Sequence, residues 1–322
     1  MSFRSALREV LRRAPGVRPV TEGGAPLERM ASDPEAPRVV DAQVVEHATL
    51  RARRVPGEPA PGFVAFLDGA QESHVVAWHL AAPIVEGRVS AAIRARVSRR
   101  LRAWGEPVVE RRVYLPFVHT DPAPWEAGFP PGVVKDTTAD EGEVPPAHPV
   151  LLLERARQAV SRDRDALEQR LAGEWCAAED RPLFIDGGIG GNAVVAAAPC
   201  VVGVIKSHRT LWVGGAALAA VLALGPGERS SVFRIPVREH SPGRRTSAVL
   251  SWYLRLRDPA GRDTLWGLVR VEVAETEGDV TARADEVSRW VLAETTPLAL
   301  PDARWDKMVY GIRNTEEYLR AI

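Results

Sequence analysis

The sequence predicts a mixed α/β (α+β) fold in which one mixed sheet is flanked by helices. Short apolar runs rich in valine, isoleucine and phenylalanine alternate with longer segments whose apolar residues recur at helical spacing. These segments follow the order strands, helix, strand, helix, strands, helices, which fits one sheet in a single domain. A length of 322 residues allows one large domain or two ordinary ones, and this order favours one.

The N-terminal part of the chain predicts an extension of that domain. Residues 1–60 are rich in proline, glycine and arginine and show no pattern of a large core. The first residues carry arginines without the apolar centre of a signal peptide, so they predict a short amphipathic helix. We therefore expect an extension over 1–60 and the main domain over 61–322.

The first half of the domain predicts a hairpin, a helix and a further strand. Apolar runs at 63–68 and 75–85 predict the paired strands. Residues 89–104 show apolar residues at helical spacing with arginines between them, which predicts a helix, and 108–118 returns to strand character. The arginines around this helix are either a plain solvated face or a surface that contacts a nucleic-acid backbone. Residues 121–143 predict an acidic loop.

The second half predicts one long helix, several strands and two final helices. The helix covers 150–171, because leucine, alanine and valine mark one face and polar residues fill the other. Strands are expected at 183–186, 201–208, 232–239, 247–257 and 265–275. The last two helices are expected at 282–293 and 315–321.

Composition excludes several classes of protein. Hydrophobic residues make up 45% and charged residues 26%, with no net charge, which excludes a disordered or collagen-like chain. Two cysteines, Cys176 and Cys200, cannot build a disulfide framework or a four-ligand zinc site. The apolar runs are shorter than the roughly 20 residues that span a bilayer. We therefore expect a cytoplasmic protein without a membrane segment, whose metal, if any, has oxygen ligands.

Two strands end in the same dipeptide, Asp-Gly. FVAFLDG places Asp68 after one apolar run, and PLFIDGG places Asp186 after another. Each aspartate alone is explained by the start of a turn. Together they suggest two carboxylates delivered to one sheet edge, where the following glycine lets backbone or substrate approach.

A third acid, Glu154, lies near the start of the helix predicted between these strands. One interpretation is a first-turn glutamate that complements the helix dipole. The other is that Glu154, at the border of the apolar stripe, points toward the sheet and joins Asp68 and Asp186. Three converging carboxylates repel one another unless a divalent cation lies among them. Mn²⁺ or Mg²⁺ held in this way suits phosphodiester hydrolysis.

A lysine closes the next strand. Only three of the 42 basic residues are lysines, and one of them, Lys206, ends VVGVIK. It is either a solvated side chain at a strand end or an ammonium group that contacts a phosphate.

The order of these motifs resembles the nuclease domain of the NurA family, over about residues 60–322. The segments that carry the resemblance are FVAFLDG, HPVLLLERAR, PLFIDGGIGG, VVGVIKSHRTLWV and LWGLVRVEV. The resemblance implies an RNase H-like fold and a nuclease, typically manganese-dependent, that acts on DNA ends with the hexameric ATPase HerA and usually dimerises. It also implies metal ligands at Asp68, Glu154 and Asp186, with Lys206 beside them.

The chain departs from the family pattern in two places. The first motif reads Asp-Gly-Ala-Gln where the family commonly has Asp-Gly-Ser, and no histidine follows His240, although many members have a C-terminal site histidine. Glu317 on the last predicted helix, or less well Asp306, would take that place. Both acids are equally compatible with ordinary surface positions.

These observations give one main hypothesis and two alternatives. The main hypothesis is a metal-dependent deoxyribonuclease in DNA end processing or a linked defence system. A catalytically weak scaffold that binds HerA or DNA is the first alternative. A ribonuclease or a guide-dependent nuclease is the second, although 322 residues leave no room for guide-binding modules.

Overall fold

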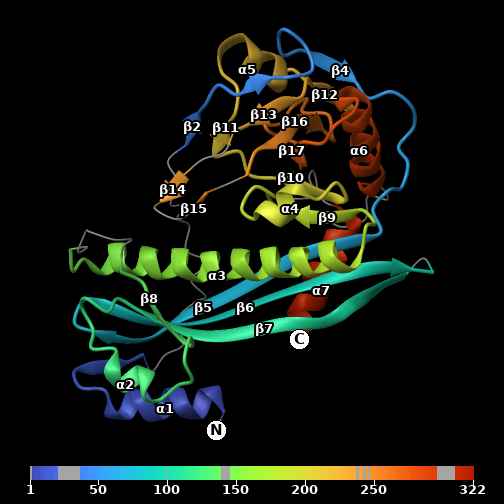
Figure 1. The fold of residues 1–322 in the computed structure, drawn as a ribbon. Helices are drawn as coiled ribbons and strands as arrows, with labels where there is room; N and C mark the ends of the chain where they lie inside the picture. Colours follow the sequence, from blue (N-terminus) through green and yellow to red (C-terminus); the bar gives the residue numbers. More distant parts are fainter. Residues whose placement is uncertain are drawn as a thin grey trace. The chain divides into compact units, whose positions relative to one another are not determined.

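A computed structural model describes most of the chain, and the mixed α/β class predicted from the sequence is confirmed. The described residues form a mixed sheet of 13 strands, two small two-stranded sheets and seven helices (Figure 1). The described residues are 2–20, 37–98, 100–138, 146–236, 239–241, 244–245, 247–295 and 309–322.

The described residues divide into two compact units, and neither is continuous in sequence. The first takes its residues from Met1–Pro34, Gly69–Ala91 and Pro107–Leu167, and the second from Glu35–Asp68, Ala92–Glu106 and Glu168–Ile322. The limits of these units do not follow the expected division at residue 60. Four elements contribute residues to both units: β5 (Ala65–His79), β6 (Ala82–Val97), β7 (Arg100–Leu115) and α3 (Pro149–Ala178).

The first unit has a core to which the N-terminal helix contributes. Helix α1 (Phe3–Arg13) begins at Ser2, whose hydroxyl accepts a hydrogen bond from the Ser5 N–H. Its apolar face packs against buried side chains of β5, β6, β7 and α2 (Ala123–Glu126), including Trp125. Two short strands complete this unit: β1 (Val17–Pro19), antiparallel to β5, and β8 (Val134–Asp136), parallel to β7. Residues 123–126 and 134–136 thus form elements where a loop was expected.

The helix predicted over 89–104 is wrong, because residues 89–97 belong to β6 and residues 100–104 belong to β7. Ala91, Ala92 and Ile93 are all buried, so this strand is covered on both faces and its apolar residues do not alternate. Its alanines and arginines favour a helix intrinsically, and burial in the sheet overrides that preference. The strand ends at Val97, and Ser98 has a positive φ of +49°, which is typical of a tight turn.

The second unit has a sheet with a short parallel centre. Strand β9 (Leu183–Asp186) pairs in parallel with the start of β5 and with β10 (Val201–Ile205). Beyond β10 the strands are antiparallel, in the order β17 (Leu268–Val273), β16 (Val249–Arg255), β13 (Phe233–Ile235) and β3 (Gln43–Val44). Both β16 and β17 are buried along their whole length, including the charged residues Arg255, Arg270 and Glu272.

Helices and short strands complete this unit. Helix α6 (Val280–Glu294) covers β16, and its Ser288 hydroxyl pairs with the Trp252 indole N–H at 2.9 Å (Figure 1). This helix and α7 (Tyr310–Ala321) confirm the two helices expected near the C-terminus. The remaining elements are α4 (Ala193–Ala197), α5 (Gly215–Leu222), β2 (Arg38–Val39), β4 (Ala52–Arg54), β11 (Thr210–Leu211), β12 (Glu228–Ser230), β14 (Glu239–Ser241) and β15 (Arg244–Arg245).

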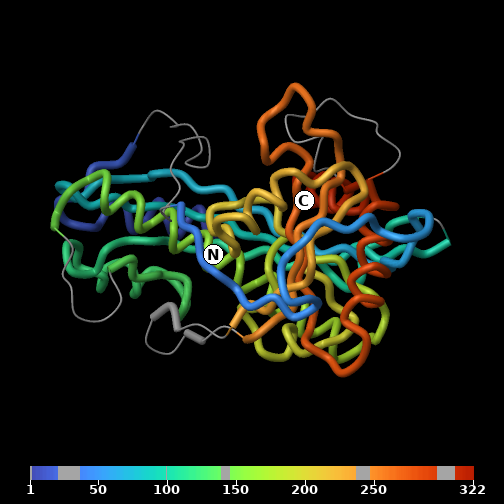
Figure 2. Tube along the Cα trace, turned by 90° about the horizontal axis from the view of Figure 1, so that it is seen from above, coloured from blue at the N-terminus to red at the C-terminus, as the bar shows by residue number. Residues whose placement is uncertain are grey.

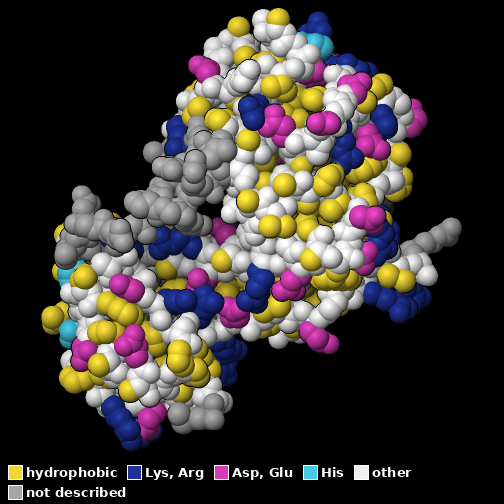
Figure 3. Space-filling view, viewed as in Figure 1, with side chains coloured by type: hydrophobic (Ala, Val, Ile, Leu, Met, Phe, Trp, Pro, Cys, Tyr) yellow, Lys and Arg dark blue, Asp and Glu magenta, His cyan; other side chains and the backbone are white. Residues whose placement is uncertain are grey.

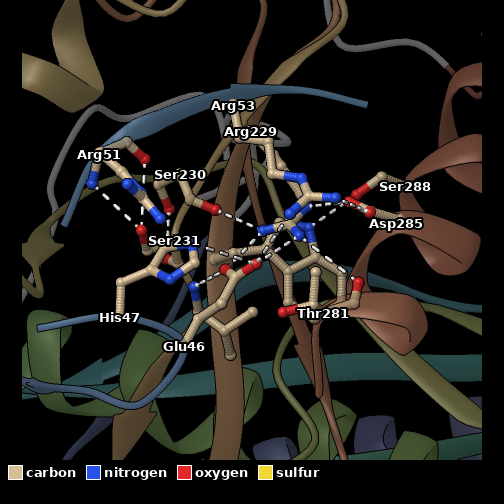
Figure 4. A network of polar contacts seen from close by, with 12 residues as sticks. Glu46, His47, Arg51, Arg53, Arg229, Ser230, Ser231, Thr281, Asp285 and Ser288 are labelled. Atoms are coloured by element: carbon tan, nitrogen blue, oxygen red, sulfur yellow. Dashed lines mark hydrogen bonds and ion pairs between the residues drawn. The ribbon is translucent and has the colours of Figure 1, made fainter. Parts of the chain in front are cut away.

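Residues before 60 lie beside strands that come some 180 residues later. In Figure 2 the blue segment runs along the yellow and orange part of the chain, where β4 pairs with β12 and β3 pairs with β13. A buried ion-pair network joins them (Figure 4). Arg229 is fully buried and donates to both carboxylate oxygens of Glu46 at 2.8 Å and to Asp285 of α6 at 2.6 Å.

Among the described helices, none has the length and apolar character needed to cross a membrane.

Candidate metal centre

Three carboxylates gather in the second unit. One oxygen each of Asp68, Asp186 and Glu316 lies within 4.8 Å of the other two. Asp68 belongs to β5, Asp186 ends β9, and Glu316 lies on α7. In the described part of the chain, this is the one group of three or more potential metal ligands that meets this distance.

Strand register explains why the two aspartates meet. Leu67 of β5 is paired with Ile185 of β9, so the next residue of each strand is an aspartate. Asp186 is in turn in register with Val204 of β10, two residues before Lys206. The parallel pairing therefore carries the ends of β9 and β10 to the same edge of the sheet, where ligands bind in open α/β sheets.

A close helix contact positions the third carboxylate. A Cβ atom on Gly311 would lie 2.4 Å from the Phe66 ring, so the start of α7 packs directly on β5. Ile312 and Thr315 are buried on the same helix, and Glu316 lies on that side, with a side chain that is 15% exposed. The expected residue, Glu317, is turned outward: its side chain is half exposed and accepts a hydrogen bond from Arg313 at 2.9 Å.

Burial and like charge act together on Asp68. The residue is buried, and this desolvation raises the pKa of its carboxyl well above the usual value. Asp186 adds the largest charge contribution, and Glu168 and Glu316 raise the pKa further. Lys206 opposes them. The carboxylates thus repel one another strongly enough that added positive charge would stabilise them.

Lys206 lies at this cluster. Its ammonium group donates a hydrogen bond of 2.7 Å to Asp186, and the two side chains are 19% and 17% exposed. The strand-end lysine is therefore half-buried and holds an acidic partner, rather than extending into solvent. It keeps a charged donor beside the carboxylates.

Glu154 is not one of the three gathered carboxylates. It lies on α3 and forms an ion pair with Arg157 at 3.7 Å. Glu168, on the same helix, is the α3 acid that acts on Asp68, and 14 residues of helix correspond to about 21 Å along the axis. Glu168 is buried and neighbours the buried Leu167 on this helix. An acid within the apolar stripe is the sequence signal that could have found it, as with Glu316. Asp306 lies outside the described residues.

The loop after Asp186 is hydrogen-bonded to β17, which lies on the other side of β10. The Ile189 N–H donates a 2.9 Å hydrogen bond to Glu272 of β17, whose other oxygen accepts from Arg270. Arg270 and Glu272 are both buried. Gly203 of β10 makes room for this loop, since a Cβ there would lie 2.6 Å from the Gly187 carbonyl oxygen. Gly187 has a φ of +146°, which glycine adopts readily.

Comparison with known proteins adds no relative. No protein-family model matches this chain, and no curated protein matches it by sequence. The chemistry of the site therefore rests on its own donors. They are carboxylate oxygens, which Mn²⁺ and Mg²⁺ prefer, and two donors bound to one such ion lie at most about 4.2 Å apart. The three carboxylate oxygens lie within 4.8 Å of one another, which is close to this upper limit.

Proposed function

We propose that this chain is a metal-dependent DNA nuclease of the NurA type, which hydrolyses phosphodiester bonds in DNA end processing. The observation that carries the proposal is the convergence of Asp68, Asp186 and Glu316 within one unit, with Lys206 bonded to the cluster. Carboxylate oxygens that are partly buried and repel one another are suited to a hard divalent cation. The resemblance of the sequence motifs to the NurA family supports the same reaction class and suggests DNA as the substrate.

The residues that would hold Mn²⁺ or Mg²⁺ are Asp68, Asp186 and Glu316, with Glu168 near enough to add negative charge. When bound, such an ion would activate a water molecule and stabilise the leaving oxygen. Lys206 offers N–H donors beside these carboxylates and can bind a non-bridging phosphate oxygen. Gly187 presents no side chain at this edge, so a nucleic-acid backbone can approach Asp186 closely.

The proposed partners are DNA, a HerA-type hexameric ATPase and a second copy of this chain. The chain has no net charge, and Figure 3 shows basic and acidic side chains mixed on the visible face. Helix α3 illustrates the mixture, with ion pairs of Arg157 to Glu154 and Arg164 to Asp165. Since long-range attraction of DNA needs a field of one sign, we propose that the ATPase supplies much of the DNA affinity.

A scaffold without nuclease activity is the second candidate, and two ion pairs favour it. Asp186 is paired with Lys206, and Glu316 with Arg313 at 3.6 Å, so two of the three carboxylates have basic partners. The sequence also lacks a histidine after His240, where many NurA proteins have one in the site. Such a protein would bind the ATPase or DNA and leave the DNA intact.

Cleavage of linear single- and double-stranded DNA distinguishes the two candidates. Wild type and Asp186→Ala are assayed with Mn²⁺, Mg²⁺ or EDTA, each with and without a HerA-type ATPase, and folding is checked by thermal denaturation. A nuclease gives metal-dependent products that the folded variant does not form. If wild type binds the ATPase and leaves DNA intact under every condition, the scaffold is correct.

The fourth acid has its own control on the same helix. Glu168→Gln should weaken metal-dependent cleavage, because Glu168 raises the pKa of Asp68. Glu154→Gln should not, because Glu154 lies about 21 Å further along α3 and pairs with Arg157. Equal losses in both variants would contradict the assignment of Glu168 to the site.

A further inference from the structure

The two cysteines of this chain lie together although 24 residues separate them. Cys176 is in the last turn of α3, and Cys200 directly precedes β10. The Cys200 Sγ is 4.0 Å from the Glu179 carbonyl oxygen, at the end of α3, and the two thiols are close enough for each to shift the pKa of the other. In a chain with no other cysteine, this places each thiol next to the one residue with which it can form an internal disulfide.

Regular structure holds both thiols in place. Cys176 is part of a continuous helix, whose adjacent residue Trp175 is fully buried and donates to the Arg181 carbonyl at 3.0 Å. The Cys200 carbonyl accepts from the Leu183 N–H at 2.9 Å, which fixes it to the start of β9. Neither side chain is fully buried, so a small oxidant can reach them.

The two thiols differ in their tendency to ionise. The hydrogen bond from Cys176 lowers the pKa of the Cys200 thiol, against the effect of burial, and the nearby Arg283 lowers it further while Asp180 raises it. The same hydrogen bond raises the pKa of Cys176. Cys200 is therefore the better nucleophile near neutral pH, since the thiolate is the reactive form.

A shared metal ion fits these thiols poorly. Zinc in proteins takes three or four protein ligands. Over the residues that the structure describes, no third histidine, cysteine or carboxylate joins Cys176 and Cys200 in a ligand cluster. A pair of adjacent thiols without further ligands is suited to thiol oxidation instead.

We propose that Cys176 and Cys200 are a reversible redox pair, which hydroperoxides convert into an internal disulfide. The Cys200 thiolate attacks one oxygen of hydrogen peroxide, the O–O bond breaks, and hydroxide leaves as a sulfenic acid forms. Cys176 then attacks the sulfenic sulfur, the S–S bond forms, the S–O bond breaks and water leaves. In total two thiols are oxidised and one hydrogen peroxide is reduced to two waters. A dithiol reductant reverses the change.

The disulfide would link two segments that carry residues of the candidate metal centre. Glu168 lies eight residues before Cys176 on α3, and Lys206 lies six residues after Cys200. The closed loop from 176 to 200 contains Asp186. The redox pair itself does not depend on the proposed nuclease activity, and its test uses no DNA.

The test measures thiols and mass in the intact wild-type protein. Reduced protein is treated with hydrogen peroxide and then unfolded, its free thiols are titrated, and its peptides are mapped without reductant. The proposal expects both thiols to disappear, the mass to fall by two hydrogens, and a cross-linked pair of peptides containing Cys176 and Cys200. The thermal midpoint should rise by on the order of 5 °C, reversibly with dithiothreitol.

Two single variants test the order of events. Cys176→Ser should accumulate a sulfenic acid at Cys200, trapped by dimedone, whereas Cys200→Ser should give little sulfenic acid at Cys176. Three outcomes would overturn the proposal: two thiols that stay titratable, oxidation that yields only cross-linked dimers, or thiols masked by zinc that EDTA releases.

Discussion

The contact between Gly311 and Phe66 makes a prediction in which two physical effects have opposite signs. Alanine at a helical glycine usually stabilises a protein by up to about 1 kcal/mol through helix propensity. At Gly311 the added Cβ would lie 2.4 Å from the Phe66 ring. That ring is fully buried beside Phe63 and Phe184, with centroids 6.3 Å and 5.8 Å away, and cannot move aside. Helix α7 must therefore shift.

The expected magnitude follows from these two terms. Overpacking a well-packed core costs about 1–3 kcal/mol, with a middle value of about 2 kcal/mol, and propensity returns up to about 1 kcal/mol. Gly311→Ala should therefore lose on the order of 1 kcal/mol. Since α7 carries Glu316, the same variant should also bind Mn²⁺ more weakly.

Urea denaturation measures the stability, and calorimetric titration measures the Mn²⁺ affinity. The matched control is Gly173→Ala in α3, where a Cβ meets no atom within 4 Å. That variant should gain about 0.5–1 kcal/mol and bind Mn²⁺ like wild type. If Gly311→Ala is as stable as wild type or more so, the close approach of α7 to β5 is refuted.

Two further predictions concern buried glutamates. Burial alone would raise the pKa of Glu46, but hydrogen bonds and charge from Arg229 and the Val232 N–H lower it from 4.5 to about 2. An acid whose folded pKa is lowered stabilises the protein above the unfolded pKa, so about 2–3 kcal/mol should disappear as the pH falls from 4.5 toward 2. Acid denaturation of wild type and Glu46→Gln measures this loss of stability, which the variant should not show. If both proteins have the same acid transition, the ion pair between Glu46 and Arg229 is contradicted. Glu272→Gln should lose stability much as Glu46→Gln does, because each glutamate pairs with an arginine and a backbone N–H. Only Glu272→Gln should also weaken Mn²⁺ binding in a titration, and equal Mn²⁺ affinities in the two variants would show that the loop after Asp186 needs no support from β17.

Strand endings were the most informative part of the sequence for the site. A strand-Asp-Gly ending fixes where a carboxylate leaves the sheet, and the parallel register of β5 with β9 then brings Asp68 and Asp186 together. The short apolar run before Lys206 likewise ends at this sheet edge, where the ammonium group of Lys206 meets Asp186. These residues could be found because a strand end is visible in sequence as a change from apolar to polar residues and glycine.

Helix acids were harder to place, since their direction depends on which helix face is buried. Glu154 and Glu168 lie on one helix, and only the packing of its second half shows which acid faces the sheet. Glu316 and Glu317 are neighbours about 100° apart around α7, so one is turned inward and the other outward. In both cases the inward acid is the one that follows the apolar stripe, which is a stronger signal than proximity to a helix end.

Strand β6 marks the limit of periodicity as evidence. Its sequence contains alanine and arginine at spacings that suit a helix, and no alternation reveals a strand covered on both faces. The partners β5 and β7 flank β6 directly in the chain, but their pairing with it does not show in the residues of β6 alone.

The discontinuous second unit has a consequence for protein synthesis. Its candidate metal centre draws Asp68 from early in the chain and Glu316 from 248 residues later. A ribosome must therefore have passed residue 316 before the three carboxylates can meet. Nascent chains that end before residue 316 would lack a complete ligand set, so the candidate metal centre cannot assemble in them.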